Sequence, residues 1–234
     1  MKIALIGYGK MGRLVEEVAR RQSIETVARF DESHPLRADE ETRGFLAGVD
    51  MLIDFSVPNA VLENIRQAAA LSMNLVIGTT GWHDQLDEAR KIVESNGIGL
   101  VYGSNFSLGV NLFYQIVEHA TKLFSKFEGY DPFLEEAHHK FKKDAPSGTA
   151  LVLKKIVAEN YEKREVPVTS VRAGHIPGTH AVSFDSTVDT IRLEHTARSR
   201  EGFAEGALVA AKWIAGKKGL FEFREVLENV ERGA

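Results

Sequence analysis

Cysteine is absent from the 234 residues of the chain. Without a thiol, the chain can form no disulfide, no thiolate metal site and no covalent intermediate on a cysteine nucleophile. An excess of positive charge is also absent, because 29 lysine and arginine residues stand against 33 aspartate and glutamate residues, a formal net charge of −4. Nucleic-acid-binding surfaces need clustered basic residues to meet phosphates. We therefore expect no nucleic-acid partner.

Long hydrophobic runs are missing as well. No stretch approaches the roughly 18 consecutive apolar residues that indicate a membrane-spanning helix, although 44% of the residues are hydrophobic and 26% are charged, as in ordinary globular chains. The first residues pass from a strand-like segment straight into a glycine loop, a pattern unlike the cleavage region of a secretory signal. We expect a globular cytoplasmic protein without a membrane partner.

The first hundred residues alternate short apolar runs with amphipathic segments. The pattern predicts strands at 2–6, 24–30, 51–55, 75–77 and 99–101, and helices at 11–21, 58–72 and 86–95. Parallel neighbouring strands require crossover connections, which helices between the strands provide. The sequence therefore predicts an α/β fold, a Rossmann-type doubly wound parallel sheet with helices on both faces.

The pattern changes near Asn105. Helical segments follow at 108–127, 148–161 and 203–215, a short final element at 221–230, and strands at 132–137, 168–172, 181–185 and 187–194. Successive strands without intervening helices are typical of an antiparallel or mixed sheet. We predict a dinucleotide-binding domain at 1–106 and a smaller α+β substrate and oligomerisation domain at 107–200.

A glycine motif follows the first predicted strand and opens the first predicted helix: Gly7, Tyr8, Gly9, Lys10, Met11 and Gly12. In this G-x-G-x-x-G pattern, glycines permit the tight turn and the close approach of backbone to a pyrophosphate at the helix N-terminus. Asp31 ends the second strand, where an acid would hold the ribose hydroxyls. The alternative is a purely structural glycine turn.

The choice of dinucleotide depends on the residue after Asp31. A 2′-phosphate needs a cation there, whereas this chain has Glu32. Two adjacent carboxylates repel that phosphate, so we expect NADH to be preferred, with NADPH possible. Arg29 and Arg37 could relieve the repulsion, and Lys10 lies close to the phosphate loop.

Two further turns follow strands of the predicted sheet. Gly78, Thr79, Thr80 and Gly81 follow the fourth strand, and Gly103, Ser104, Asn105 and Phe106 follow the fifth. Ligands of open α/β sheets bind outside the carboxyl ends of the strands. Small residues there would let the backbone approach a nicotinamide ribose, although spacing alone equally fits structural turns.

Candidate chemical groups concentrate between Glu135 and Ala150. A histidine can deliver a proton near neutral pH, and a lysine is a compact cation for a carboxylate. Ser147 is a candidate N-cap, which would leave the amides of Gly148 and Thr149 open to an anion. A solvated basic loop remains an alternative. We expect no metal, because no third ligand stands at ligand spacing beside the paired histidines.

The remaining histidines carry weaker expectations. His175 and His180 flank a glycine-rich loop that could line a site, and His195 fits a structural position at the end of a strand. Three others fit surface or cap positions: His34, His83 and His119.

The stretch from Glu136 through Ala150 closely resembles the signature of the bacterial dihydrodipicolinate reductase family, also called 4-hydroxy-tetrahydrodipicolinate reductases. The resemblance extends over nearly the whole chain in the family's order. The further matching segments are Gly7–Gly12, Gly78–Thr80, Asn105–Ser107, Gly109–Asn111 and Arg172–Gly174.

This resemblance implies an NAD(P)H-dependent oxidoreductase of lysine and diaminopimelate biosynthesis. Its substrate would be a cyclic imine dicarboxylate that receives a hydride at ring C4 and a proton at C3. The resemblance further implies a nucleotide domain completed by residues 201–234, and a homotetramer formed through the central domain.

Site roles follow from the positions that match the family. His138 and Lys142 match the catalytic pair, and Lys142 also matches a substrate contact. The other implied substrate contacts are His139, Ser147, Gly148 and Thr149. The implied cofactor contacts are Gly7, Tyr8, Gly9, Lys10, Met11, Gly12, Asp31, Gly78, Thr79, Thr80, Gly103, Ser104, Asn105 and Phe106.

Two positions depart from the family pattern. Phe141 stands where many members have another histidine, and Glu32 replaces the arginine of members that use NADPH. The second departure supports the expectation of NADH. A different class of function also remains open, a dinucleotide-binding module that senses NADH without catalysis. Aspartate-semialdehyde dehydrogenase activity is excluded, because it needs a cysteine nucleophile.

Overall fold

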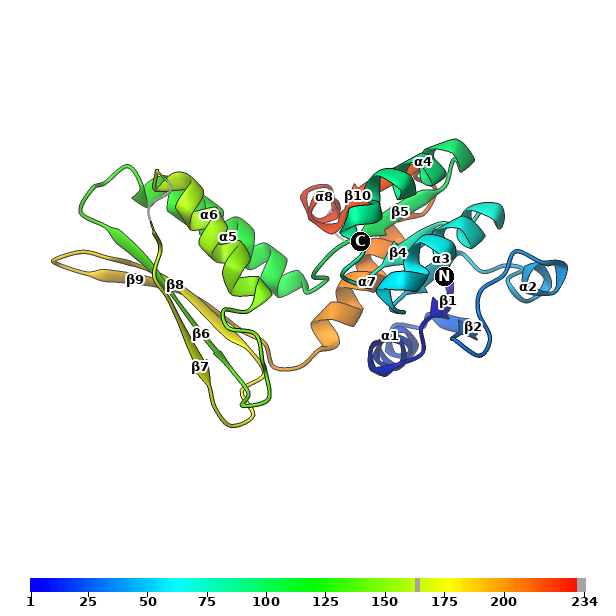
Figure 1. Cartoon of the computed structure of the whole chain (residues 1–234), viewed down its shortest axis with the longest axis horizontal. Helices are drawn as coiled ribbons and strands as arrows, with labels where there is room; N and C mark the ends of the chain where they lie inside the picture. Colours follow the sequence, from blue (N-terminus) through cyan, green and yellow to red (C-terminus); the bar gives the residue numbers. More distant parts are fainter. Residues whose placement is uncertain (163–164, 231–234) are drawn as a thin grey trace. The chain divides into compact units, whose positions relative to one another are not determined.

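The computed structural model describes residues 1–162 and 165–230. The chain divides into two compact units (Figure 1). The first unit comprises Met1–Leu108 and Glu201–Ala234, and the second unit comprises Gly109–Arg200. Within the described ranges, no helix has the length and apolar character that a membrane crossing requires.

A six-stranded parallel sheet forms the centre of the first unit, in the order β10-β5-β4-β3-β1-β2. Its strands are β1 (Lys2–Ile6), β2 (Glu25–Phe30), β3 (Met51–Asp54), β4 (Leu75–Ile77), β5 (Gly99–Tyr102) and β10 (Gly219–Glu222). Every residue of β3 and β4 is buried, as expected of parallel strands covered on both faces. The predicted doubly wound sheet is confirmed.

Helices cover both faces of this sheet (Figure 1). Helices α1 (Lys10–Arg21) and α7 (Glu201–Ile214) contribute to the apolar core on one face, and α3 (Pro58–Ala70) and α4 (Leu86–Asn96) to the core on the other. Pro58 occupies the first turn of α3, where its missing amide proton costs no helical hydrogen bond. A short 3-10 helix, η1 (His83–Gln85), precedes α4, and α8 (Phe223–Glu228) follows β10.

Three short elements of the first unit were not predicted, among them the single-turn η1. Helix α2 (Glu40–Phe45) is too short for a clear apolar period, yet Asp39 caps it by accepting a hydrogen bond from the Thr42 amide at 2.8 Å. Strand β10 has only four residues and pairs with β5, far away in the sequence. A strand this short, paired with a distant segment, has no pattern of its own in the nearby sequence that would predict it.

The second unit contains a four-stranded mixed sheet in the order β7-β6-β8-β9. Its strands are β6 (Asp131–His138), β7 (Val168–Arg172), β8 (Thr179–Asp185) and β9 (Thr190–Thr196). Strands β6 and β7 are parallel because α6 (Gly148–Asn160) connects them, whereas β8 runs antiparallel to both β6 and β9. The predicted combination of a Rossmann-type sheet with a mixed sheet is therefore confirmed.

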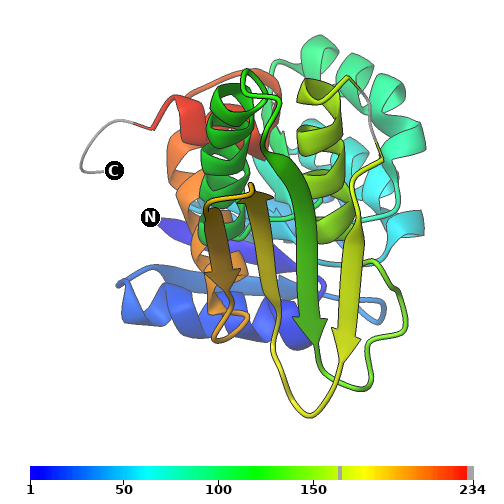
Figure 2. The same cartoon turned by 90° about the vertical axis from the view of Figure 1, so that its left-hand side faces the viewer.

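Helices α5 (Leu108–Phe124) and α6 lie against one face of this sheet (Figure 2). Phe113 of α5, Leu153 of α6 and Phe184 of β8 belong to the core between them. Two predicted boundaries were wrong by three residues: the helix expected to reach residue 127 ends at Phe124, and the strand expected from residue 187 begins at Thr190.

Candidate active site

The proposed cofactor residues follow the carboxyl ends of strands in the six-stranded sheet. The chain proceeds from β1 outward to β2 on one side and through β3, β4 and β5 on the other. The order therefore reverses between β1 and β3, and such a switch point is where open α/β sheets bind ligands. The glycine loop after β1 and the segment after β3 meet there, because a Cβ added to Gly7 would lie 2.5 Å from the carbonyl oxygen of Phe55.

The glycine loop has the geometry that a dinucleotide pyrophosphate needs. Gly7 has φ of +85°, which side-chain-bearing residues rarely adopt. A Cβ on Gly12 would lie 2.2 Å from the carbonyl oxygen of Gly7, so only glycine allows α1 to pack this close. Gly9 is the N-cap of α1, and apart from its chain neighbours and the helix backbone no described atom lies within 4 Å of a Cβ built on it. The open helix N-terminus thus presents amide groups to an anion.

Asp31 and Glu32 are both exposed just beyond the end of β2. The carboxylate of Asp31 accepts hydrogen bonds from the amides of Ser33 at 2.9 Å and His34 at 3.0 Å. These bonds fix the turn and leave the second carboxylate oxygen for another partner. The geometry is compatible with a ribose contact by Asp31.

A buried carboxylate, Asp54 at the end of β3, organises the loop after β4. It accepts hydrogen bonds from the Thr79 hydroxyl at 3.0 Å, the Asn64 amide group at 2.8 Å and the Ser56 amide at 2.7 Å. Burial nevertheless raises the pKa of Asp54. The indole of Trp82 donates to the Thr79 carbonyl at 2.9 Å. The Gly78–Thr80 turn is thereby held in one position.

The predicted contacts after β5 divide between exposed and buried residues. Ser104 is exposed and Asn105 half-buried, whereas Phe106 is only 2% exposed and packs against Phe223 with ring centroids 4.5 Å apart. Gly103 is buried, with Phe223 3.0 Å from the position of an added Cβ. Phe106 therefore supports this loop from the core.

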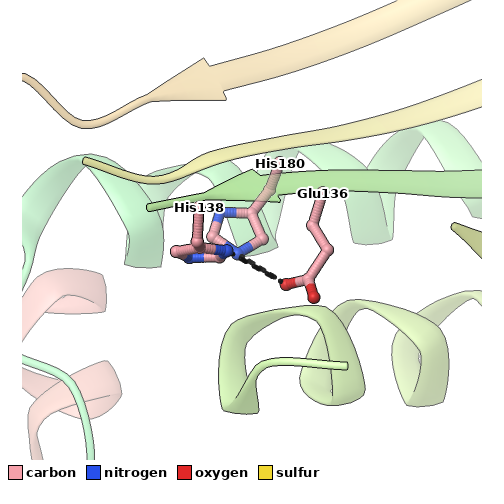
Figure 3. A group of neighbouring side chains, drawn as sticks. All are labelled: Glu136, His138 and His180. Carbon is pink, nitrogen blue, oxygen red and sulfur yellow. Dashed lines mark ion pairs between the residues drawn. The ribbon is translucent and has the colours of Figure 1, made fainter. Parts of the chain in front are cut away.

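In the second unit, strand register brings a carboxylate and two histidines together. Glu136 and His138 are two residues apart on β6 and share one face of the strand. The antiparallel register pairs Glu136 with His180 of β8, and the parallel register pairs His138 with Arg172 of β7. Figure 3 shows the carboxylate and both imidazoles pointing toward one another.

Glu136 is the centre of this cluster and is 2% exposed. Its carboxylate accepts hydrogen bonds from the Ser147 amide at 3.1 Å, the Ser170 hydroxyl at 2.7 Å and Arg172 Nη2 at 2.6 Å. Burial alone would raise the pKa of Glu136, but these donors outweigh it and lower the pKa to about 2. The carboxylate is therefore ionised at any pH near neutrality.

The two histidines respond to the same environment. His138 Nδ1 lies 3.5 Å from a Glu136 oxygen, and His180 Nε2 lies 3.6 Å from that oxygen and 3.0 Å from the Ser147 hydroxyl. Burial lowers the pKa of both rings, to about 4 for His180. For His138 the carboxylate opposes this shift and the Lys142 ammonium adds to it. His180 is therefore neutral near pH 7.

The start of α6 completes the cluster. Ser147 is the N-cap of α6, as predicted, and its hydroxyl accepts a hydrogen bond from the Ala150 amide at 3.3 Å. Gly148 is exposed and Thr149 half-buried. Lys142 is 25% exposed and pairs with Asp144 at 2.9 Å. His139, directly after β6, is half-buried, and its Nδ1 has no hydrogen-bond partner among the described residues.

Glu136, His138 and His180 also form a group of residue types that can ligate a metal ion. Ligand atoms of Glu136, His138 and His180 lie within 4.8 Å of one another, a grouping that sequence spacing missed. However, the carboxylate already accepts three kinds of donor, one of them the cationic guanidinium of Arg172. A second cation beside it would be repelled, and we interpret the cluster as a proton-handling group.

Sequence reasoning gave no site role to three members of this cluster: Glu136, Arg172 and His180. Glu136 received no role, and His180 was expected in a loop, whereas it lies in β8 and is 5% exposed. The E-x-H spacing of Glu136 and His138 on one predicted strand was an available signal. No such signal existed for His180, because only the register of β6 and β8 brings it near.

Comparisons with known proteins agree along the whole chain. Residues 1–106 match the family described as dihydrodipicolinate reductase, N-terminus, and residues 109–227 match dihydrodipicolinate reductase, C-terminus. A 4-hydroxy-tetrahydrodipicolinate reductase of Christiangramia forsetii is 38% identical over 244 residues, covering 98% of this chain and 99% of the relative. One from Methanoregula boonei is 37% identical over 252 residues, covering 97% of both chains.

A solved structure shares the fold. The dipicolinate-bound dihydrodipicolinate reductase from Paenisporosarcina sp. TG-14 superimposes with a TM-score of 0.80 at 23% identity, covering 96% of this chain and 98% of that one. Family matches over both units and relatives above 30% identity confirm the resemblance seen in the sequence. This chain belongs to the dihydrodipicolinate reductase family.

Proposed function

We propose that the chain reduces 4-hydroxy-tetrahydrodipicolinate to tetrahydrodipicolinate, in lysine and diaminopimelate biosynthesis, with a reduced pyridine nucleotide. The observation that carries the proposal is the juxtaposition of His138, its carboxylate partner Glu136 and the cation Lys142 beside the open start of α6. A proton donor and anion-binding groups are what a dicarboxylate reductase requires. The non-catalytic sensor is not favoured, because the curated relatives are named as reductases.

The reaction needs one hydride and one proton. Loss of the ring hydroxyl with a neighbouring proton, as water, leaves a conjugated cyclic imine. Ring C4 then accepts a hydride, which the nicotinamide supplies when bound, and the resulting enamine takes a proton at C3. We assign proton delivery to His138. A bound dianion would raise the pKa of that imidazole and so favour its protonated form.

The remaining groups bind the two substrate carboxylates in this proposal. Lys142 is a compact cation near His138, and the amides of Gly148 and Thr149 stand at the positive end of α6. His139 and Ser147 would add hydrogen bonds. Their shared feature is positive or donor character, which matches an anionic ring.

We assign cofactor binding to the carboxyl edge of the six-stranded sheet. The loop Gly7–Gly12 would take the pyrophosphate, Asp31 the adenosine ribose, and the turns 78–80 and 103–106 the nicotinamide end. Glu32 beside Asp31 would repel a 2′-phosphate, so we propose that NADH is preferred over NADPH.

A coupled assay tests the reaction. Aspartate semialdehyde and pyruvate, condensed by the preceding synthase, would supply fresh substrate to the purified chain while NADH or NADPH absorbance is followed. We expect oxidation that requires the synthase product and is faster with NADH. Dinucleotide binding without any oxidation would overturn the reductase proposal and restore the sensor.

Assembly and location are further parts of the proposal. We propose a homotetramer formed through the second unit, where no helix of its described residues covers the sheet face opposite α5 and α6 (Figure 2). Light scattering on the purified chain would test this. A cytoplasmic location stays a prediction, which cell fractionation would check.

A further inference from the structure

Arg29 of β2 and Glu16 of α1 form a two-point ion pair beside the glycine loop. Nε of Arg29 donates to Glu16 Oε2 at 3.2 Å, and Nη2 donates to Oε1. The hydroxyl of Tyr8, within the loop, donates to the same carboxylate. The guanidinium also lies over the Tyr8 ring, 5.5 Å from its centroid. Bidentate arginine–carboxylate pairs are geometrically specific, so this network fixes the direction of the guanidinium.

Arg29 lies close in sequence to Asp31, the proposed ribose contact. Arg29 is the next-to-last residue of β2, and Asp31 follows the end of that strand directly. Rossmann-type folds accommodate the 2′-phosphate of NADPH with an arginine near the ribose-binding acid. Arg29 is thus a cation two residues from the proposed ribose contact, and its guanidinium binds Glu16 of α1.

We propose that Glu16 is a cofactor-selecting residue, which favours NADH by holding Arg29 away from the 2′-phosphate position. This inference rests on the proposed use of a pyridine nucleotide and on Asp31 as its ribose contact. It differs from the repulsion by Asp31 and Glu32, because Glu16 removes an attraction instead of adding a repulsion. The guanidinium of Arg29 lowers the pKa of Glu16, so the carboxylate is charged and competes fully with a phosphate.

Other cations lie nearby and must be separated from Arg29. The Arg13 guanidinium is 5.0 Å from the centroid of the Tyr8 ring, and Lys10 is exposed in the loop. Both remain in every variant below, so they contribute equally throughout. Glu17, exposed on α1, provides a matched loss of one negative charge next to Glu16.

The experiment measures the Kd of NADH and of NADPH by fluorescence titration of the full chain without substrate. The variants are Glu16→Ala, Glu17→Ala, Arg29→Gln and the double variant Glu16→Ala/Arg29→Gln. We expect Glu16→Ala to tighten NADPH binding about tenfold, the effect of one charge-assisted contact in a partly solvated place, and to change NADH less than about twofold. Glu17→Ala should change the Kd of neither NADH nor NADPH.

The arginine variants identify the cause. Arg29→Gln alone should leave both affinities near those of the parent chain, because the guanidinium is already held by Glu16. The double variant should lose the gain in NADPH affinity. The inference is overturned if Arg29→Gln alone raises the Kd of NADPH about tenfold. It is also overturned if Glu17→Ala tightens NADPH binding as Glu16→Ala does, or if Glu16→Ala changes the Kd of NADH and of NADPH by the same factor.

The binding assay also separates this inference from the proposed reaction. If the variants show the expected Kd values but the parent chain shows no oxidation in the coupled assay, the role of Glu16 is supported and the proposed reductase activity is overturned. A parent chain that binds neither dinucleotide overturns both.

Discussion

Replacement of Glu136 by glutamine should remove a large electrostatic stabilisation from the second unit. Glutamine keeps the shape of the side chain and resembles the protonated acid. Three donors, among them the mostly buried Arg172, lower the pKa of Glu136 from 4.5 to about 2. This difference corresponds to about 3 kcal/mol of unfolding free energy near neutral pH. Removal of one partner from a buried ion pair typically costs about 3–5 kcal/mol, which agrees.

The pH dependence of this loss has a definite sign. Because the pKa of Glu136 is lower in the folded chain, the stabilisation is complete above about pH 5 and disappears as the pH falls from 4.5 toward 2. The unfolding free energies of the parent chain and of Glu136→Gln should therefore differ most near pH 7 and become equal in acid. Urea unfolding at several pH values, followed by circular dichroism, measures the difference.

Glu135 provides the matched control for this experiment. It neighbours Glu136 on β6, points to the opposite face, and pairs with Arg192 while 43% of its side chain is exposed. Glu135→Gln should cost less than about 1 kcal/mol, as exposed pairs do. The reasoning is refuted if Glu136→Gln lowers the unfolding free energy by less than about 1 kcal/mol, or if both variants lower it equally. It is also refuted if the stability difference between the parent chain and Glu136→Gln does not decrease in acid.

The remaining predictions concern the reaction and its cofactor. His138→Gln should lower kcat by about 10²–10⁴ in the coupled assay without changing dinucleotide Kd, and a loss under tenfold would contradict its role as proton donor. Lys142→Ala should raise KM and lower kcat, because it binds substrate as well; an unchanged KM in steady-state kinetics would exclude that contact. Gly12→Ala, whose Cβ would lie 2.2 Å from the Gly7 oxygen, should abolish dinucleotide binding in a fluorescence titration, whereas Gly44→Ala, with open space around it, should not.

Local patterns were enough to predict the first sheet. Most of its strands have an apolar run and most of its longer helices an apolar face, and their alternation was enough to predict a parallel sheet covered by helices on both faces. The glycine loop was equally local, because strand, turn and helix N-terminus are contiguous. Strand β10 escaped prediction because its partner β5 is far away in the sequence.

The site in the second unit could be predicted only in part, for the same reason. His138, Lys142 and Ser147 lie in one continuous segment, which made them visible as candidates. His180 and Arg172 join them through the registers of β8 and β7 against β6, and a shift of one residue would turn each side chain to the opposite face. Sequence patterns do not specify those registers.

Three carboxylates of this chain show that partners and burial, more than residue type, decide what an acid does. Asp31 is exposed and bonded on one oxygen to backbone amides, which leaves it available for a ribose. Glu16 is bound on both oxygens to an arginine, and its effect is to restrain that cation. Glu136 is buried among donors with its charge fixed, so it can orient His138 without exchanging protons itself. A sequence alone displays three similar acids, and the distinct roles proposed for them follow from their neighbours.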